Sequence, residues 1–119
     1  MHSGLLRTMH PPVKSGCVKS PHFEFYFAGL THPGGVNKQN QDDFFVHHEA
    51  DHNFAVFGVF DGHGREVGKL GANAAREYVE LEIQQPNMIE NFRTRPRATM
   101  RALFRGAHLA VKQVGLLWG

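Results

Sequence analysis

The chain has 119 residues, 41% of them hydrophobic and 11% aromatic, enough for one ordinary domain with an apolar core. A formal net charge of +2 is too small to predict nucleic-acid binding, and no stretch approaches the roughly 20 apolar residues of a membrane span. The single cysteine excludes an internal disulfide framework and favours a reducing compartment. We therefore expect an intracellular protein, cytoplasmic or nuclear, monomeric, and without nucleic-acid or membrane partners.

The first 21 residues contain several prolines, scattered basic side chains and no acid. This composition predicts a flexible N-terminal tail over 1–21 and a folded region over 22–119. A basic start without acids is also compatible with an organelle transit peptide, although this one is not arginine-rich. Targeting to an organelle therefore stays open.

Three strands are expected in the first half of the chain. Residues 22–30, HFEFYFAGL, alternate phenylalanine with other residues and predict a strand with one buried face. After the turn at 31–35 we expect a short strand at 44–48, a connection at 49–53 and a buried strand at 54–60. Short links between them favour an antiparallel arrangement.

Two helices are expected in the second half. Apolar residues recur at helical spacing from 65 to 83, and a second helix should begin at Thr94 or Pro96. Strands followed by helices predict an α+β fold with helices packed on a sheet. The first helix should lie close to that sheet because one part of its surface carries only small residues: Gly68, Gly71, Ala72 and Ala75.

The second helix carries a stripe of basic residues beside its apolar positions: Arg97, Arg101, Arg105, His108 and Lys112. A solvated face is the simpler interpretation, and contact with an acidic partner is the alternative. The final residues, 114–119, are apolar and uncapped, which we interpret as a cut or a frameshift rather than a natural terminus.

The end of the strand at 54–60 carries the first candidates for chemistry. Asp61 follows this apolar run directly, and Gly62 and Gly64 flank His63, so that the backbone can turn tightly and approach a ligand. His63 is either a proton donor or a polar turn residue.

Asp42 is the acid that can pair with Asp61, since one hairpin separates the two positions. Two carboxylates and a glycine carbonyl would form an all-oxygen site of the kind that suits magnesium or manganese. The alternative is that each aspartate only forms a turn or caps a helix.

Three histidines near 49–53 raise the separate question of a transition metal: His47, His48 and His52. Their spacing matches no closed tetrahedral site, and no cysteine lies nearby. We interpret them as the exposed end of a hairpin.

Two motifs carry a resemblance to a known family. VNKQNQDDFF at 36–45, followed by FAVFGVFDGHG at 54–64 and a helix rich in Gly and Ala, resembles the amino-terminal part of the metal-dependent protein phosphatases of the 2C type. The likeness covers roughly residues 25–115. It corresponds to only the first part of that family's catalytic domain.

The resemblance implies a role for each matching residue. Asp61 would bridge two magnesium or manganese ions, Gly62 would bind one of them through its carbonyl, and Asp42 would help hold water at the ions. His63 would be the general acid for the leaving oxygen. The implied substrates are phosphoserine and phosphothreonine proteins, and the implied fold is a four-layer sandwich of two antiparallel sheets flanked by helices.

The chain departs from the family in three places. Gln41 stands where many relatives have glutamate, and Asn37, with Lys38 beside it, stands where relatives often have a phosphate-binding arginine. No aspartate follows Asp61, so the later metal-binding segments are absent. We expect an N-terminal phosphatase fragment that is inactive or nearly so alone; the alternative is a non-catalytic interaction or regulatory protein.

Overall fold

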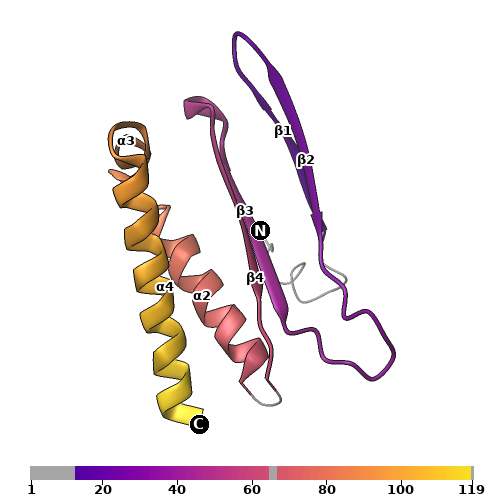
Figure 1. Ribbon diagram of the computed structural model, residues 1–119. Helices are drawn as coiled ribbons and strands as arrows, with labels where there is room; N and C mark the ends of the chain where they lie inside the picture. The colour runs from indigo at the N-terminus through magenta and orange to yellow at the C-terminus, as the bar shows by residue number, and fades with distance from the viewer. Residues whose placement is uncertain (1–12, 65–66, 119) are drawn as a thin grey trace.

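The computed structural model describes residues 13–64 and 67–118 (Figure 1). Two hairpins come first in the chain, and helices follow them. The elements in order are β1 (Val13–Lys19), β2 (Glu24–Leu30), β3 (Asp42–Glu49), a 3-10 turn (Ala50–His52), β4 (Phe54–Asp61), α2 (Gly68–Glu82), α3 (Met88–Thr94) and α4 (Pro96–Trp118).

The strands form two separate two-stranded antiparallel sheets, β1–β2 and β3–β4. In the second sheet the ladder runs from Asp42 opposite Asp61 to Glu49 opposite Phe54. The antiparallel arrangement is therefore confirmed. The strand expected at 44–48 is longer than predicted, because pairing already begins at Asp42.

Strand β1 is a correction to the sequence analysis, which assigned residues 1–21 to a flexible tail. Residues 13–19 pair along their whole length with β2, and Val18 is buried. The tail composition was misleading because β1 is paired with β2 through its backbone, and backbone pairing requires no apolar pattern in β1 itself. The rest of the expected tail, residues 1–12, lies outside the described residues.

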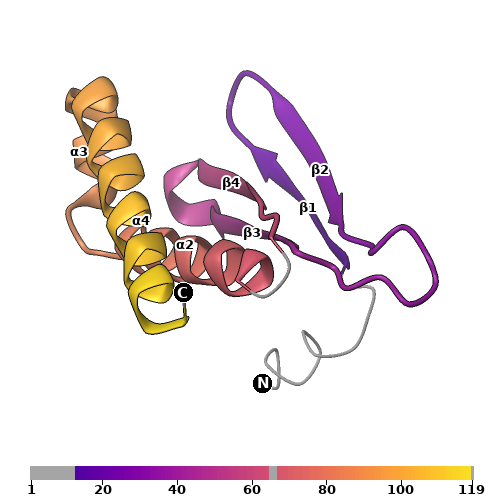
Figure 2. The ribbon, with the colours of Figure 1, turned by 60° about the horizontal axis from the view of Figure 1, so that its bottom comes forward.

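The first hairpin lies beside the face of β3–β4 that points away from the helices (Figures 1 and 2). Phe57 of β4 makes the contact, with its ring centroid 5.7 Å from Phe25 and 5.1 Å from Phe27, both on β2. The helices cover the opposite face of β3–β4. The predicted α+β class is confirmed, and the layering is consistent with part of a four-layer sandwich.

The core lies between β3–β4 and the helices. Phe45, Ile83, Met88 and Leu103 form its buried cluster, and the rings of Phe45 and Phe60 stack with centroids 5.9 Å apart. Four small residues of α2 are buried where the helix packs against its neighbours: Gly68, Gly71, Ala72 and Ala75. A Cβ atom on Gly71 would lie 3.6 Å from Val111 of α4, so this surface packs against α4 as well as the sheet.

The helix boundaries differ modestly from the expectation. The first predicted helix, 65–83, is observed as α2 over Gly68–Glu82, and residues 65–66 lie outside the described residues. The short helix α3 was not predicted. Helix α4 begins at Pro96, one of the two predicted starts, where a proline needs no hydrogen-bond partner for its nitrogen.

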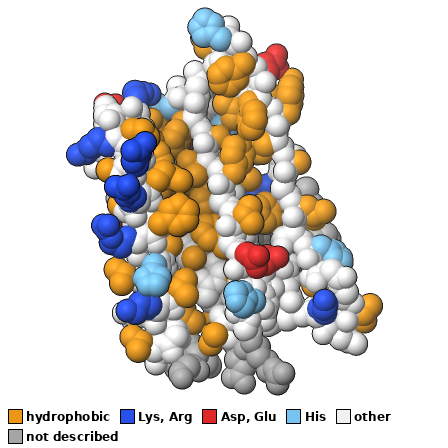
Figure 3. Space-filling model, in the orientation of Figure 1, with side chains coloured by type: hydrophobic (Ala, Val, Ile, Leu, Met, Phe, Trp, Pro, Cys, Tyr) orange, Lys and Arg blue, Asp and Glu red, His pale blue; other side chains and the backbone are white. Residues whose placement is uncertain are grey.

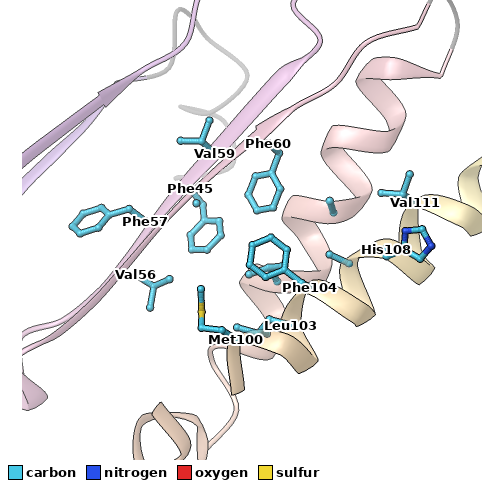
Figure 4. Close-up of a pocket in the computed structure, with 14 residues that line it drawn as sticks. Phe45, Val56, Phe57, Val59, Phe60, Met100, Leu103, Phe104, His108 and Val111 are labelled. Carbon is cyan, nitrogen blue, oxygen red and sulfur yellow. The ribbon is translucent and has the colours of Figure 1, made fainter. Parts of the chain in front are cut away.

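An apolar groove of about 540 Å³ follows the open edge of β4 (Figure 4). Consecutive residues from Val56 to Phe60 line one side, and α4 supplies Met100, Leu103 and Phe104 on the other. Val59 is 82% exposed and Phe104 70% exposed. An open strand edge beside apolar side chains is a surface prone to self-association.

Helix α4 also presents its basic stripe to solvent, as the solvated-face interpretation requires: Arg97, Arg101, Arg105, His108 and Lys112 are all exposed. Basic side chains gather along this helix beside the hydrophobic surface (Figure 3). Within residues 13–64 and 67–118, no helix is both long and apolar enough to cross a membrane.

Candidate functional site

Asp42 and Asp61 lie directly opposite each other at the open end of the β3–β4 ladder. Residues opposite each other in an antiparallel pair project from the same face, with Cα atoms about 4.5–5.5 Å apart. Both side chains are exposed. The prediction that one hairpin brings these two acids together is confirmed.

Two facing carboxylates repel each other, and a divalent cation between them would relieve that repulsion. Their oxygen atoms are the ligand type that magnesium and manganese prefer. In the part of the chain that the structure describes, however, no group of three His, Cys, Asp or Glu side chains is close enough to hold a metal ion. The residues present fit part of a hard-metal site.

The turn after β4 carries Gly62 and His63 into an open cavity of about 320 Å³ between β4 and the start of α2. A Cβ atom on Gly62 would overlap the carbonyl of Gly68 and lie 2.7 Å from that of Gln41, so this position admits only glycine. Gly64 has φ of 131°, which also favours glycine. Asp61, Gly62 and His63 therefore line one cavity, whereas Asp42 is not among its lining residues and lines a separate depression.

Gln41 joins the beginning of β3 to this turn, a contact that the sequence analysis missed. Its side-chain nitrogen Nε2 donates a hydrogen bond to the carbonyl oxygen of Gly64 at 2.7 Å. The same oxygen accepts the backbone N–H of Gly68 at 3.3 Å. No pattern in the sequence signals this contact, because 23 positions separate its two partners.

The side chains of Asp42 and Asp43 lie on opposite faces of the β3–β4 sheet. That of Asp43 lies on the face that packs against α2. Arg76 Nε donates to Asp43 Oδ2 at 2.7 Å, and Arg76 Nη1 donates to Glu80 Oε1 at 2.9 Å. Burial of the guanidinium opposes its charge, but the hydrogen bonds to Asp43 and Glu80 outweigh burial and raise the pKa of Arg76. Two sequence features could have predicted these contacts: the alternation of side chains along β3, and the i,i+4 spacing of Arg76 and Glu80.

Lys38, predicted to bind phosphate, lines an open polar depression of about 450 Å³ together with His32 and Asp42. The structure therefore brings Lys38 into the neighbourhood of Asp42. Asn37, the other phosphate-binding candidate, has φ of 65° in the preceding turn and is not among the residues that line this depression. Its conformation is explained by the turn, since asparagine tolerates the left-handed region.

Two of the three histidines at the far end of the hairpin, His47 and His52, contact Glu49. His47 Nε2 lies 2.8 Å from Glu49 Oε2, and His52 Nδ1 lies 3.4 Å from Glu49 Oε1. The hydrogen bond from His47 lowers the pKa of Glu49. Among the described residues, no group of three His, Cys, Asp or Glu side chains that could hold a metal ion is found at this end of the hairpin.

Comparison with known proteins gives a partial match. The chain is 34% identical over 87 residues to the protein named "Probable protein phosphatase 2C 35" from Arabidopsis thaliana, a match of 67% of this chain and 25% of that protein. The chain thus spans about a quarter of the length of this curated relative. No protein-family model matches the chain, and no solved structure matches it. In sequence, the chain is similar to part of a protein phosphatase 2C.

Proposed function

We propose that this chain is an N-terminal portion of a magnesium- or manganese-dependent protein serine/threonine phosphatase of the 2C type. The observation that carries the proposal is the placement of Asp42 opposite Asp61, at the ladder end that continues into Gly62 and His63. The similarity to a phosphatase 2C adds support. The substrates would be phosphoserine and phosphothreonine proteins inside the cell.

Each residue has a part in the proposed reaction. Asp42, Asp61 and the Gly62 carbonyl would hold the two divalent ions, which supply the positive charge that activates water and neutralises phosphate. His63, exposed in the turn after β4, would donate a proton to the leaving oxygen. Lys38 would contribute charge to phosphate binding from the neighbouring depression.

The chain by itself should bind the ions weakly and should be nearly inactive. Two carboxylates and one carbonyl leave most coordination positions of each ion to water, and a site with few protein ligands has low affinity. With excess Mn²⁺, the chain should hydrolyse a phosphopeptide no faster than its Asp61→Ala variant. Metal-dependent turnover that this substitution abolishes would contradict the expectation of inactivity.

Metal binding itself tests the site. Titration with Mn²⁺, followed by paramagnetic broadening of amide signals, should first broaden residues around Asp42, Asp61 and Gly62. Asp61→Asn should abolish this pattern, whereas Asp51→Asn, at the far end of the same hairpin, should leave it unchanged. Broadening centred on His47 and His52 instead would refute the proposed site.

The second candidate is a non-catalytic protein that uses a phosphatase-like fold as a binding surface. The exposed groove along β4 favours it, together with the lack of a third metal-binding side chain among the described residues. This role requires the chain to fold alone. A cooperative thermal transition, dispersed amide signals and no response to Mn²⁺ would together favour it over the phosphatase.

A further inference from the structure

Gln41 contacts the turn after β4 at three backbone positions. Its Nε2 donates to the Gly64 carbonyl, and its own carbonyl oxygen lies 2.7 Å from the place of a Cβ atom on Gly62. Its Oε1 lies 2.8 Å from the place of a Cβ atom on Gly68. Gln41, directly before β3, therefore packs against both ends of the Gly62–Gly64 turn that contains His63.

The amide group is required for this arrangement. The Gly64 oxygen is an acceptor, so its partner must donate, and an ionised glutamate at position 41 would set a second acceptor against it. The absence of side chains at Gly62 and Gly68 leaves the space into which Gln41 fits. A donor at position 41 and glycines at positions 62 and 68 therefore fit together at this turn.

The contact between Gln41 and the turn matters because the candidate site residues lie next to both partners. Asp42 follows it in the chain, while Asp61 and His63 flank Gly62. The position of the Gly62 carbonyl and His63 relative to Asp42 therefore depends on two connections: the last rung of the β3–β4 ladder and the bond from Gln41 to Gly64. The ladder fixes Asp61, and the bond fixes the turn beyond it.

We propose that Gln41 is a positioning residue that holds the Gly62–Gly64 turn against β3, so that the Gly62 carbonyl and His63 stay beside the Asp42–Asp61 pair. The metal-related part of this inference rests on the proposed function. Its side-chain nitrogen donates to Gly64, and it is this hydrogen bond that the proposal assigns to positioning. Positioning groups of this kind change metal affinity by roughly tenfold or more when removed.

The test compares Gln41→Met with Gln39→Met in the full chain. Methionine keeps the length of glutamine and lacks its donor, and Gln39 lines the same depression as Gln41. Gln41→Met should weaken Mn²⁺ binding by roughly tenfold. It should also speed hydrogen exchange at Gly68, whose N–H shares the Gly64 oxygen. Gln39→Met should change neither, and unchanged signals of β3 and β4 would show that both variants fold.

A second variant separates the loss of the hydrogen-bond donor from the change in charge at position 41. Gln41→Glu also lacks a donor at neutral pH, so exchange at Gly68 should accelerate as in Gln41→Met even if the added carboxylate strengthens Mn²⁺ binding. Slow exchange at Gly68 in both variants, or unchanged Mn²⁺ affinity in Gln41→Met, would overturn the proposal. If the unaltered chain binds no Mn²⁺, the proposed function fails, and exchange at Gly68 then decides the positioning role alone.

Discussion

Arg76 of α2 binds Asp43 of β3 with 2.7 Å between Nε and Oδ2, across the interface between the helix layer and the second sheet. The side chains are only 17% and 22% exposed. The contact fixes which aspartate of the pair 42–43 faces the helices and leaves Asp42 on the other face, opposite Asp61.

Replacing Arg76 should therefore destabilise the chain. Arg76→Met leaves Asp43 half-buried without its partner, which should lower the free energy of unfolding by about 2 kcal/mol. Arg93→Met is the matched control, because Arg93 pairs with Glu90 at a site where both side chains are 63% exposed. This variant should change the free energy of unfolding by no more than about 0.5 kcal/mol. Urea denaturation measures both, and equal effects would contradict a structural role for Arg76.

A side chain at Gly106 should require Tyr78 to move. A Cβ atom there would overlap the ring of Tyr78 where α4 crosses α2. Gly106→Ala should therefore lower the free energy of unfolding by about 1–3 kcal/mol, although alanine is the better helix former. In the same helix, no atom of another described part of the chain is found within 4 Å of a Cβ on Gly115. Gly115→Ala should therefore raise the free energy of unfolding by up to about 1 kcal/mol. If both variants raised the melting temperature, the overlap with Tyr78 would carry no cost and the prediction for Gly106 would be wrong.

Glu49 should make the stability of the chain depend on pH in the acidic range. Its pKa is lower in the folded chain than the ordinary 4.5, because of the hydrogen bond from His47. The charged carboxylate therefore stabilises the folded state above pH 4.5, and this contribution is lost as the pH falls through the folded pKa. The melting temperature should exceed that of Glu49→Gln at pH 6, and the difference should shrink below pH 4.5. A difference that grows toward lower pH would contradict the assignment.

The groove along β4 should limit the solubility of the chain. Phe104 is exposed within the groove, so Phe104→Ser should raise the concentration at which light scattering detects aggregation, with little loss of stability. Leu109→Ser is the control, since Leu109 is 55% exposed on α4 but is not among the groove-lining residues. A similar gain from both variants would show that general surface hydrophobicity, and not the groove, drives association.

Much of the fold and part of the candidate site could be read from local pattern. Alternation along 54–60 and the short connection at 49–53 predicted a hairpin, and a hairpin with that loop sets Asp42 opposite Asp61. Residues 13–19 could not be predicted in this way, since their strand is defined by backbone pairing with β2 rather than by a pattern of their own. Helix α3 is short and follows a proline, which gave the sequence no clear period.

The sequence by itself determined the period of each main element and the residue types of the turn at 62–64, because strand alternation, helix spacing and glycine freedom are local properties of the chain. Only the tertiary structure decided that Gln41 donates to Gly64, that Arg76 binds Asp43 and that the edge of β4 stays open beside α4. These relationships join residues far apart in the chain, and they depend on how the layers pack, which no local period encodes.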